Sequence, residues 1–423
     1  MNPPDVPEHL PDRLAISLWD FSWYTRTGPT EPFADLDAAF ARAVELGYNA
    51  VRICAMPFLV FRSNLDTRAL RLEPLGEGYG SRVRWYDVRE PTVIDARAHL
   101  LAFFRTADRH GVSVIASSWE YQQSPAFAAD PAWYEALHAV EPERRLTVLG
   151  EALADLIDLL AEHGLEHTVA LVELHNELQL GHLTEGLPGA EDPVIELRER
   201  AEAGIAAFND RHPEVLCAAN YGGVPVASMR GLPGNATALV FHPYVYGVLD
   251  ELVEEFALRG EAADFPQDRA DAELLRPGAP RLGEWGPGPG AEWKLQASIV
   301  NPVEIYVHDW CDPEKFDRWL YERYGNHQRA MAARLRDWIG VAADHARRLG
   351  VPVLFGEGWV GYTPRDCRFE EGPVGAAICR DAAALAAEVG AWGSICCSNA
   401  APHHSMWADV ELQRECNAVI RTG

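Results

Sequence analysis

Short apolar segments alternate with longer amphipathic segments along almost the whole chain. Eight of the apolar segments have the length and composition of buried strands: residues 14–19, 50–54, 112–116, 169–175, 215–219, 238–242, 351–355 and 392–397. Continuous apolar strands separated by amphipathic segments are typical of a parallel sheet whose crossover connections are helices. We therefore predict an α/β fold built from repeated strand–helix units.

Four of the amphipathic segments end at a glycine shortly before a predicted strand. They are residues 34–46, 95–110, 151–163 and 324–349, followed by Gly47, Gly111, Gly164 and Gly350. A glycine after the last turn readily adopts the left-handed conformation that closes a helix. Eight strands with such helices would close a (β/α)8 TIM barrel. An open doubly wound sheet is the alternative, but no Gly-x-Gly-x-x-Gly fingerprint follows the first strand.

One long segment after the sixth predicted strand interrupts this alternation. It covers residues from about 245 to 323 and includes the run Gly286-Pro287-Gly288-Pro289-Gly290. A connection of this length is usually a lid or a wall of a binding site. We predict a single (β/α)8 domain over residues 13–423 that carries this insertion, preceded by a disordered N-terminus over residues 1–12.

Composition and charge narrow the possible partners and the location. Of the 423 residues, 48% are hydrophobic, which allows a large core, and the formal net charge is −26. This charge disfavours nucleic acid and anionic membrane surfaces as partners. The 8 cysteines form no Cys-x-x-Cys pair, so we expect buried, reduced thiols. No signal peptide or membrane-spanning run is evident, and we predict a cytoplasmic protein. Nothing in the sequence indicates the oligomeric state.

The polar residues that follow the predicted strands are candidates for chemistry, because active-site groups of a barrel lie at the carboxyl ends of its strands. Two of them are carboxylates from nearly opposite sides of the barrel. Glycoside hydrolysis needs such a pair, one protonated to donate to the leaving oxygen and one ionised to attack the anomeric carbon. The 13 tryptophans would suit stacking on sugar rings. The candidates are Arg52, Trp119, His175, Asn176, Glu177, His242, Tyr244, Glu357, Trp359 and Trp407.

Four segments resemble clan A glycoside hydrolases, in particular the cellulase-like family 5 group. They are Asn49-Ala50-Val51-Arg52-Ile53, Glu173-Leu174-His175-Asn176-Glu177, His242-Pro243-Tyr244 and Phe355-Gly356-Glu357. The resemblance spans predicted strands two to seven. It implies a retaining β-glycoside hydrolase with Glu177 as acid/base and Glu357 as nucleophile. Arg52 would orient the nucleophile, and Asn176, His242 and Tyr244 would line the site.

Three positions depart from the pattern of that family. Leu178 stands where a proline usually follows the acid/base, and Trp119 lies in the region of the usual strand-three histidine. The strand-eight tryptophan is not at its usual place, although Trp407 lies further on. We therefore expect a divergent group with a sugar specificity of its own. His175, Trp119, Trp359 and Trp407 are kept as candidate substrate contacts.

We expect the substrate to be a short oligosaccharide or glycoside, because a cytoplasmic enzyme meets small imported sugars more readily than polymers. No metal and no organic cofactor is expected. Two alternatives stay open. The chain could be a non-catalytic sugar-binding protein on the same scaffold. It could also be a metal-dependent, sugar isomerase-like barrel, for which Glu173, His175, Glu177, His242, Glu357 and His404 offer possible ligands.

Overall fold

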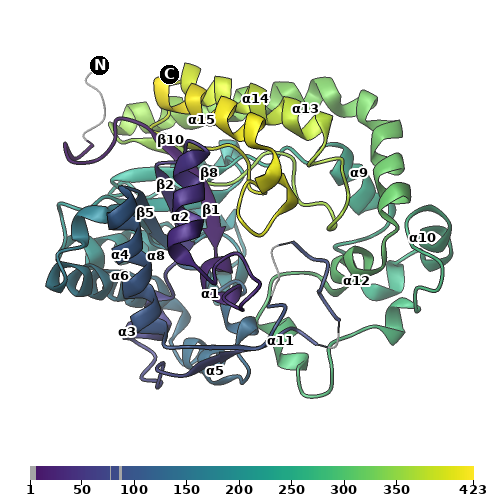
Figure 1. Ribbon diagram of the computed structural model, residues 1–423, viewed down its shortest axis with the longest axis horizontal. Coiled ribbons are helices and arrows are strands. Elements are labelled where there is room, and N and C mark those ends of the chain that lie inside the picture. Colours follow the sequence, from purple (N-terminus) through teal and green to yellow (C-terminus); the bar gives the residue numbers. More distant parts are fainter. Residues whose placement is uncertain (1–5, 77, 85–87) are drawn as a thin grey trace.

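The computed structural model describes residues 6–76, 78–84 and 88–423, and its centre is a closed barrel of eight parallel strands (Figure 1). Every predicted strand is present, with bounds that differ by a few residues, so the predicted (β/α)8 fold is confirmed. The barrel strands are β1 (Leu14–Asp20), β2 (Ala50–Cys54), β5 (Ser113–Ser117), β6 (Val169–Glu173), β7 (Cys217–Gly222), β8 (Ala238–His242), β9 (Val353–Phe355) and β10 (Gly393–Ile395).

The first and last strands pair with each other and close the barrel. β1 pairs in parallel with β10, from Leu14 opposite Gly393 to Ile16 opposite Ile395. On its other side β1 pairs with β2, and this pairing changes register between Leu18 and Asp20. Two short strands, β3 (Leu70–Leu72) and β4 (Thr92–Ile94), form a separate antiparallel pair.

Helices surround the strands, as Figure 1 shows, with α13, α14 and α15 along one side of the barrel. The helices outside the insertion are α1 (Ser22–Thr25), α2 (Leu36–Glu45), α3 (Pro57–Phe61), α4 (Ala96–His110), α5 (Ala132–His138), α6 (Arg145–Glu162), α7 (Pro193–Glu196), α8 (Arg198–Asn209), α13 (Pro313–Leu349), α14 (Pro373–Glu388) and α15 (Val410–Thr422). Short 3-10 helices are η1 (Ser124–Phe127), η2 (Pro142–Arg144), η3 (Glu166–Thr168), η4 (Gly181–Thr184), η5 (Val226–Gly231), η6 (Ala262–Asp264), η7 (Leu282–Glu284) and η8 (Ser405–Ala408).

Local sequence signals explain where the long helices begin. Helix α13 has 37 residues and starts at Pro313, well before the predicted start at residue 324. The side chain of Asp312 accepts hydrogen bonds from the backbone N–H groups of Glu314 and Lys315, and proline occupies the first helical position. Both features favour a helix start at Pro313. The prediction of a later start rested on the apolar periodicity alone.

Close packing of two helices on the outside of β6 depends on glycine. A Cβ atom added at Gly150 of α6 would lie 2.1 Å from the carbonyl oxygen of Gly204 on α8. Only glycine permits this approach of two backbones. It brings α6 and α8 into close contact with each other.

The insertion after β8 consists largely of helices. Between β8 and α13 lie α9 (Val248–Glu255), α10 (Gln267–Glu273), α11 (Glu292–Gln296) and α12 (Pro302–Trp310), and Figure 1 shows α9, α10 and α12 to one side of the barrel. The first turns of α13 belong to the predicted insertion range of about 245–323. The insertion contributes one wall of the cavity described below.

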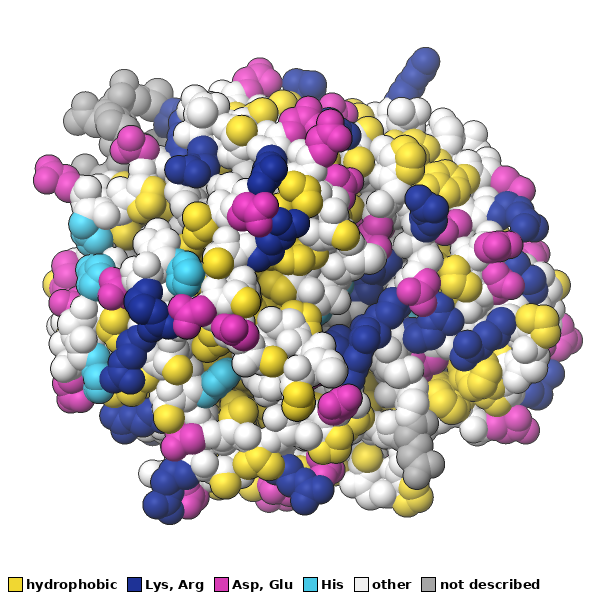
Figure 2. Space-filling model, viewed as in Figure 1, with side chains coloured by type: hydrophobic (Ala, Val, Ile, Leu, Met, Phe, Trp, Pro, Cys, Tyr) yellow, Lys and Arg dark blue, Asp and Glu magenta, His cyan; other side chains and the backbone are white. Residues whose placement is uncertain are grey.

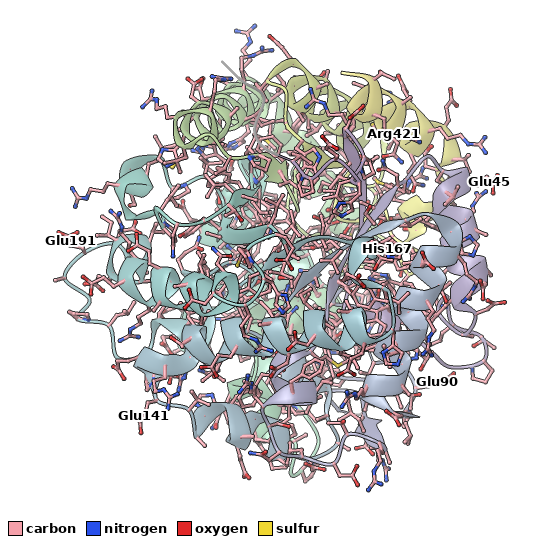
Figure 3. The ribbon with its side chains drawn as sticks, turned by 90° about the vertical axis from the view of Figure 1, so that its left-hand side faces the viewer. Glu45, Glu90, Glu141, His167, Glu191 and Arg421 are labelled. Carbon is pink, nitrogen blue, oxygen red and sulfur yellow. The ribbon has the colours of Figure 1, made fainter. Side chains whose placement is uncertain are left out.

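Part of the N-terminus that was predicted to be disordered packs against the rest of the protein. Residues 1–5 of the predicted disordered N-terminus lie outside the described residues, whereas Leu10 is 8% exposed and Trp392 Nε1 donates to the carbonyl oxygen of Pro11. Acidic and basic side chains are interspersed on the face in Figure 2, and Figure 3 shows Glu141 and Glu191 at the periphery. All eight cysteines are free and buried, as predicted. No helix in the described part of the chain is long and apolar enough to cross a membrane.

Candidate active site

A buried arginine on β2 organises the carboxyl ends of the strands. Arg52 donates from Nε and Nη2 to the two carboxylate oxygens of Glu173, at 2.8 and 2.6 Å. It also donates from Nη1 to Glu357 Oε1 at 2.9 Å and from Nη2 to Asn176 Oδ1 at 2.6 Å. Its guanidinium lies 4.5 Å from the centre of the Trp119 ring. Burial opposes the charge of Arg52, but Glu173 and Glu357 outweigh it and raise the pKa of Arg52.

Glu357 follows β9 and is held by donors on both carboxylate oxygens. While Arg52 binds Oε1, the hydroxyl of Tyr244 donates to Oε2 at 2.9 Å. Tyr244 is fixed in turn by Ser398 Oγ, 2.7 Å from its hydroxyl oxygen. The preceding residue must be glycine, because a Cβ at Gly356 would lie 2.9 Å from a methyl group of Val240 on β8. These contacts fix the orientation of the Glu357 carboxyl group at the cavity.

Glu177 lies opposite, on the segment that follows β6. Its backbone has a φ of 46°, and its N–H donates to Asn220 Oδ1 at 2.8 Å. Burial raises the pKa of Glu177 to about 7, against the opposing charge of Arg52. One of its oxygens lies within 4.8 Å of an oxygen of Glu357. The site thus contains a carboxyl group that is readily protonated close to one that accepts two hydrogen bonds.

His242 links these groups, and its tautomer follows from the hydrogen bonds. Because Asn220 Oδ1 accepts the Glu177 N–H, the amide nitrogen of Asn220 must face His242 Nε2, 3.0 Å away. Nε2 therefore accepts, and the ring proton lies on Nδ1, which donates to Glu177 Oε1 at 3.0 Å. Burial lowers the pKa of His242 to about 4, so the ring is neutral at neutral pH.

The two carboxyl groups open into one cavity of about 230 Å³. One wall comes from the insertion and its approach, which place Tyr246, Arg259, Ile299, Val300 and Glu304 at the cavity. Among the lining residues, the carboxyl groups are Asp20, Glu177, Glu304 and Glu357, and the basic side chain is Arg259. Arg259 lies 3.5 Å from Glu304 and partly offsets this excess of acid groups. The cavity is therefore better suited to a neutral or cationic ligand than to an anion.

The structure brings most of the candidate residues together. Trp119, Asn176, Glu177, Tyr244 and Glu357 all line the cavity. Arg52 and His242 lie directly beneath these residues, in contact with Glu357 and Glu177 respectively.

Three candidates point elsewhere. His175 is fully buried, accepts the Tyr121 N–H at Nε2, and lies 2.6 Å from the Asn176 carbonyl oxygen through Nδ1. Trp359 is 1% exposed, and its indole N–H donates to the carbonyl oxygen of Cys396. Trp407 stacks on Tyr48 with ring centres 5.8 Å apart. In this structure none of the three lines the cavity, and each contacts neighbouring parts of the protein.

Several residues of the site were not among the candidates. Asp20 and Asn220 end or nearly end β1 and β7, the first and fifth barrel strands, so the rule used for the other strands would have found both. Arg259 and Glu304 lie in the insertion, and no local pattern marks them. Glu173 was named only as part of a segment that carries the resemblance and as a possible metal ligand.

The spacing of Glu177, His242 and Glu357 would also allow a metal ion, since one ligand atom of each lies within 4.8 Å of the others. The nitrogen of His242 that faces both carboxylates is Nδ1, at 3.0 and 3.6 Å. This nitrogen carries the proton in the tautomer set by Asn220, and a metal ligand must be unprotonated. The trio therefore fits a hydrogen-bonded acid site better than a metal site.

Comparisons with known proteins support the fold and the expected resemblance. Residues 16–179 match the family model described as sugar-binding cellulase-like, which confirms the cellulase-like resemblance over the segment through Glu177. A search of curated proteins gives no match.

One solved structure supports the same fold, and two others are more distantly similar. A Parabacteroides distasonis protein, provisionally described as a glycoside hydrolase, is 19% identical, with 98% of this chain and 94% of that chain aligned and a TM-score of 0.68. The endo-β-1,4-mannanase of Thermotoga petrophila is 14% identical, with 97% and 77% aligned and a TM-score of 0.48. A family 5 mannosidase of Rhizomucor miehei is 10% identical, with 97% and 93% aligned and a TM-score of 0.47. Only the first of these is similar enough to support an argument, and it supports the fold.

Proposed function

We propose that this cellulase-like (β/α)8 barrel is a retaining β-glycoside hydrolase with Glu177 as acid/base and Glu357 as nucleophile. The observation that carries the proposal is the pair of carboxyl groups within 4.8 Å, one with a pKa raised to about 7 and the other bound by Arg52 and Tyr244. Retaining glycosidases have their carboxyl groups about 5 Å apart, whereas inverting enzymes need room for a water molecule between them.

In the first step Glu177 donates its proton to the glycosidic oxygen while Glu357 attacks the anomeric carbon. The bond to the leaving group breaks, and the sugar becomes an ester of Glu357. Because His242 Nδ1–H donates to Oε1 of Glu177, the transferable proton belongs on the other oxygen. In the second step the ionised Glu177 removes a proton from water, which attacks the anomeric carbon and releases Glu357.

The cavity favours a small substrate. Its volume of about 230 Å³ is below the usual range for ligand pockets, roughly 300–1,000 Å³, and suits one or two sugar rings. The insertion closes one side with Arg259, Glu304 and neighbouring residues. For a cytoplasmic protein, as the sequence predicts, short oligosaccharides or simple glycosides are the natural substrates. We therefore expect action at the end of a short chain.

The first test is chromophore release from a panel of aryl β-glycosides of different sugars. Wild type should release the chromophore from at least one of them, and Glu357→Gln should lose more than 10³-fold in kcat because no covalent intermediate can form. Glu284→Gln is the matched control, since Gly283-Glu284-Trp285-Gly286 has a similar local sequence but Glu284 is exposed in the insertion. Equal activity of wild type and Glu357→Gln would exclude the proposed nucleophile.

The stereochemistry and the acid role can be tested separately. Proton NMR of the first product should show the β-anomer before mutarotation, whereas an initial α-anomer would exclude retention. In Glu177→Gln, a dinitrophenyl glycoside should still form the ester, because its leaving group needs no proton. Its breakdown should be slow and should be accelerated by azide, a nucleophile that requires no base. Equal losses with dinitrophenyl and unactivated glycosides would contradict an acid role for Glu177.

The two alternatives predict different results. A non-catalytic sugar-binding protein would bind a sugar in the cavity without releasing any aglycone. At the cavity, the metal-dependent alternative is favoured by the spacing of Glu177, His242 and Glu357. Activity that survives prolonged treatment with a strong chelator would exclude it, and activity restored by an added divalent ion would support it.

A further inference from the structure

The carboxyl group of Asp20, at the end of β1, faces the cavity, and the proposed reaction does not use it. Asp20 is 6% exposed and lines the cavity together with Glu357. Its φ of 38° lies in the left-handed region, and the pairing of β1 with β2 changes register between Leu18 and Asp20. Irregular strand pairing and left-handed non-glycine residues cost free energy, and they often re-aim a side chain at a functional site. The strand therefore departs from regular geometry where it presents this carboxyl group.

The carboxyl group of Asp20 is only partly satisfied by the protein. Oδ1 accepts the backbone N–H of Ser22 at 2.7 Å, and among the described residues no basic side chain forms an ion pair with Asp20. Burial, with a smaller contribution from the charge of Glu357, raises the pKa of Asp20 to about 7. A buried carboxyl group without a counter-charge is unfavourable unless a ligand adds further hydrogen bonds.

The surroundings of Asp20 match the two faces of a sugar ring. Leu18, Phe21 and Tyr362 line the cavity together with it and offer apolar and aromatic surface. Sugar rings have apolar C–H faces that pack on such surface, and their hydroxyl groups need polar partners at the ring edge. A carboxylate accepts hydrogen bonds at both oxygens and can thus bind neighbouring hydroxyl groups.

We propose that Asp20 binds hydroxyl groups of the sugar ring that lies over Glu357, and so determines which sugar the site accepts. The identity of that ring as the one transferred to Glu357 rests on the proposed function. The binding itself does not, because it needs only the cavity and the carboxyl group.

The test combines Asp20→Ala with monodeoxy aryl glycosides of the preferred sugar. Asp20→Ala should lower kcat/KM for the parent glycoside by about 10- to 100-fold, the size of a lost hydrogen bond to a charged group, and Asp20→Asn should lose less. For wild type, one deoxy glycoside should show a loss of similar size. For Asp20→Ala, that same deoxy glycoside should react within about twofold of the parent. This non-additivity requires contact with the hydroxyl group, which a merely structural role would not produce.

Asp130→Asn is the matched control, because Asp130 makes the same type of bond, to the N–H of Ala132 at 3.0 Å, on the surface. It should leave all rates unchanged. If every deoxy glycoside loses the same factor in wild type and in Asp20→Ala, Asp20 does not bind the sugar and the inference is overturned.

Should wild type release no aglycone, the proposed function fails but the inference is still tested by binding. Ligand-observed NMR with a panel of free monosaccharides should then detect binding to wild type and Asp130→Asn that Asp20→Ala lacks. Equal binding to wild type and Asp20→Ala would overturn the inference, as would the absence of binding to wild type.

Discussion

Removal of the guanidinium of Arg52 should destabilise the protein strongly. In Arg52→Met the carboxylates of Glu173 and Glu357 lose three hydrogen bonds of 2.6–2.9 Å, and Asn176 Oδ1 loses one of 2.6 Å. The side chains of Arg52 and Glu173 are both 0% exposed, so solvent cannot replace the lost partner. Breaking a buried ion pair from one side costs about 3–5 kcal/mol in free energy of unfolding.

Urea unfolding followed by tryptophan fluorescence measures this change. Arg68→Met is the control, because Arg68 forms an ion pair with Asp66 on the surface, where the two side chains are 81% and 62% exposed. The urea concentration at the midpoint of unfolding should be the same for Arg68→Met and wild type. Addition of Glu173→Gln to Arg52→Met should restore part of the lost free energy of unfolding, since one uncompensated buried charge disappears. An Arg52→Met protein that unfolds at the same urea concentration as wild type would refute the assignment of Arg52 as the buried counter-charge of this site.

Three further predictions concern the chemistry of the cavity. Activity should fall about tenfold per pH unit above pH 7, because Glu177 then loses its proton. The charge of Arg259 lowers the pKa of Glu177, so Arg259→Gln should move this fall in activity to higher pH. A shift to lower pH would contradict the reasoning. Nitrogen-15 NMR of the imidazole should show the proton of His242 on Nδ1, and Asn220→Leu should give a mixture of tautomers; a proton on Nε2 in wild type would be inconsistent with the hydrogen bonds described. A uronide of the preferred sugar should react at least about tenfold more slowly than the neutral glycoside, with less difference at high salt. The reason is that the carboxyl groups of Asp20, Glu304 and Glu357 face one arginine in the cavity even while Glu177 holds its proton. Equal rates would show that this charge does not reach the substrate.

The barrel could be predicted from the sequence because its strands are buried on both faces. Such strands are continuous apolar runs, and all eight were found, whereas the start of α13 at Pro313 depended on a cap and a proline rather than on periodicity. Glu177, Glu357 and Arg52 were among the candidates because the strand ends of a barrel converge, and the structure places their side chains together. Asp20 was missed although it ends the first strand, and the irregular pairing that aims it at the cavity has no sequence signal.

Side-chain direction explains the remaining differences. Trp359 and His175 lie within two residues of a predicted catalytic glutamate, but the chain has left the regular strand there and turns both into the protein interior. Arg259 and Glu304 reach the cavity from the insertion, and only tertiary folding brings them to the strand ends. Position directly after a strand therefore identified residues at the centre of the site, but it did not identify the residues that form its walls.

One wall of the cavity and the proposed reactive groups come from different parts of the chain. The strands and the residues directly after them carry the proposed proton donor, the proposed nucleophile and their hydrogen-bond network, while residues 248–312 supply Arg259, Ile299 and Glu304 to the wall. Replacement of residues 248–312 by a short connection would alter which lengths of saccharide can enter, and it would keep Tyr244, which binds Glu357, in place. Exchange of this one helical insertion should therefore change the accepted substrate length separately from the proposed chemistry.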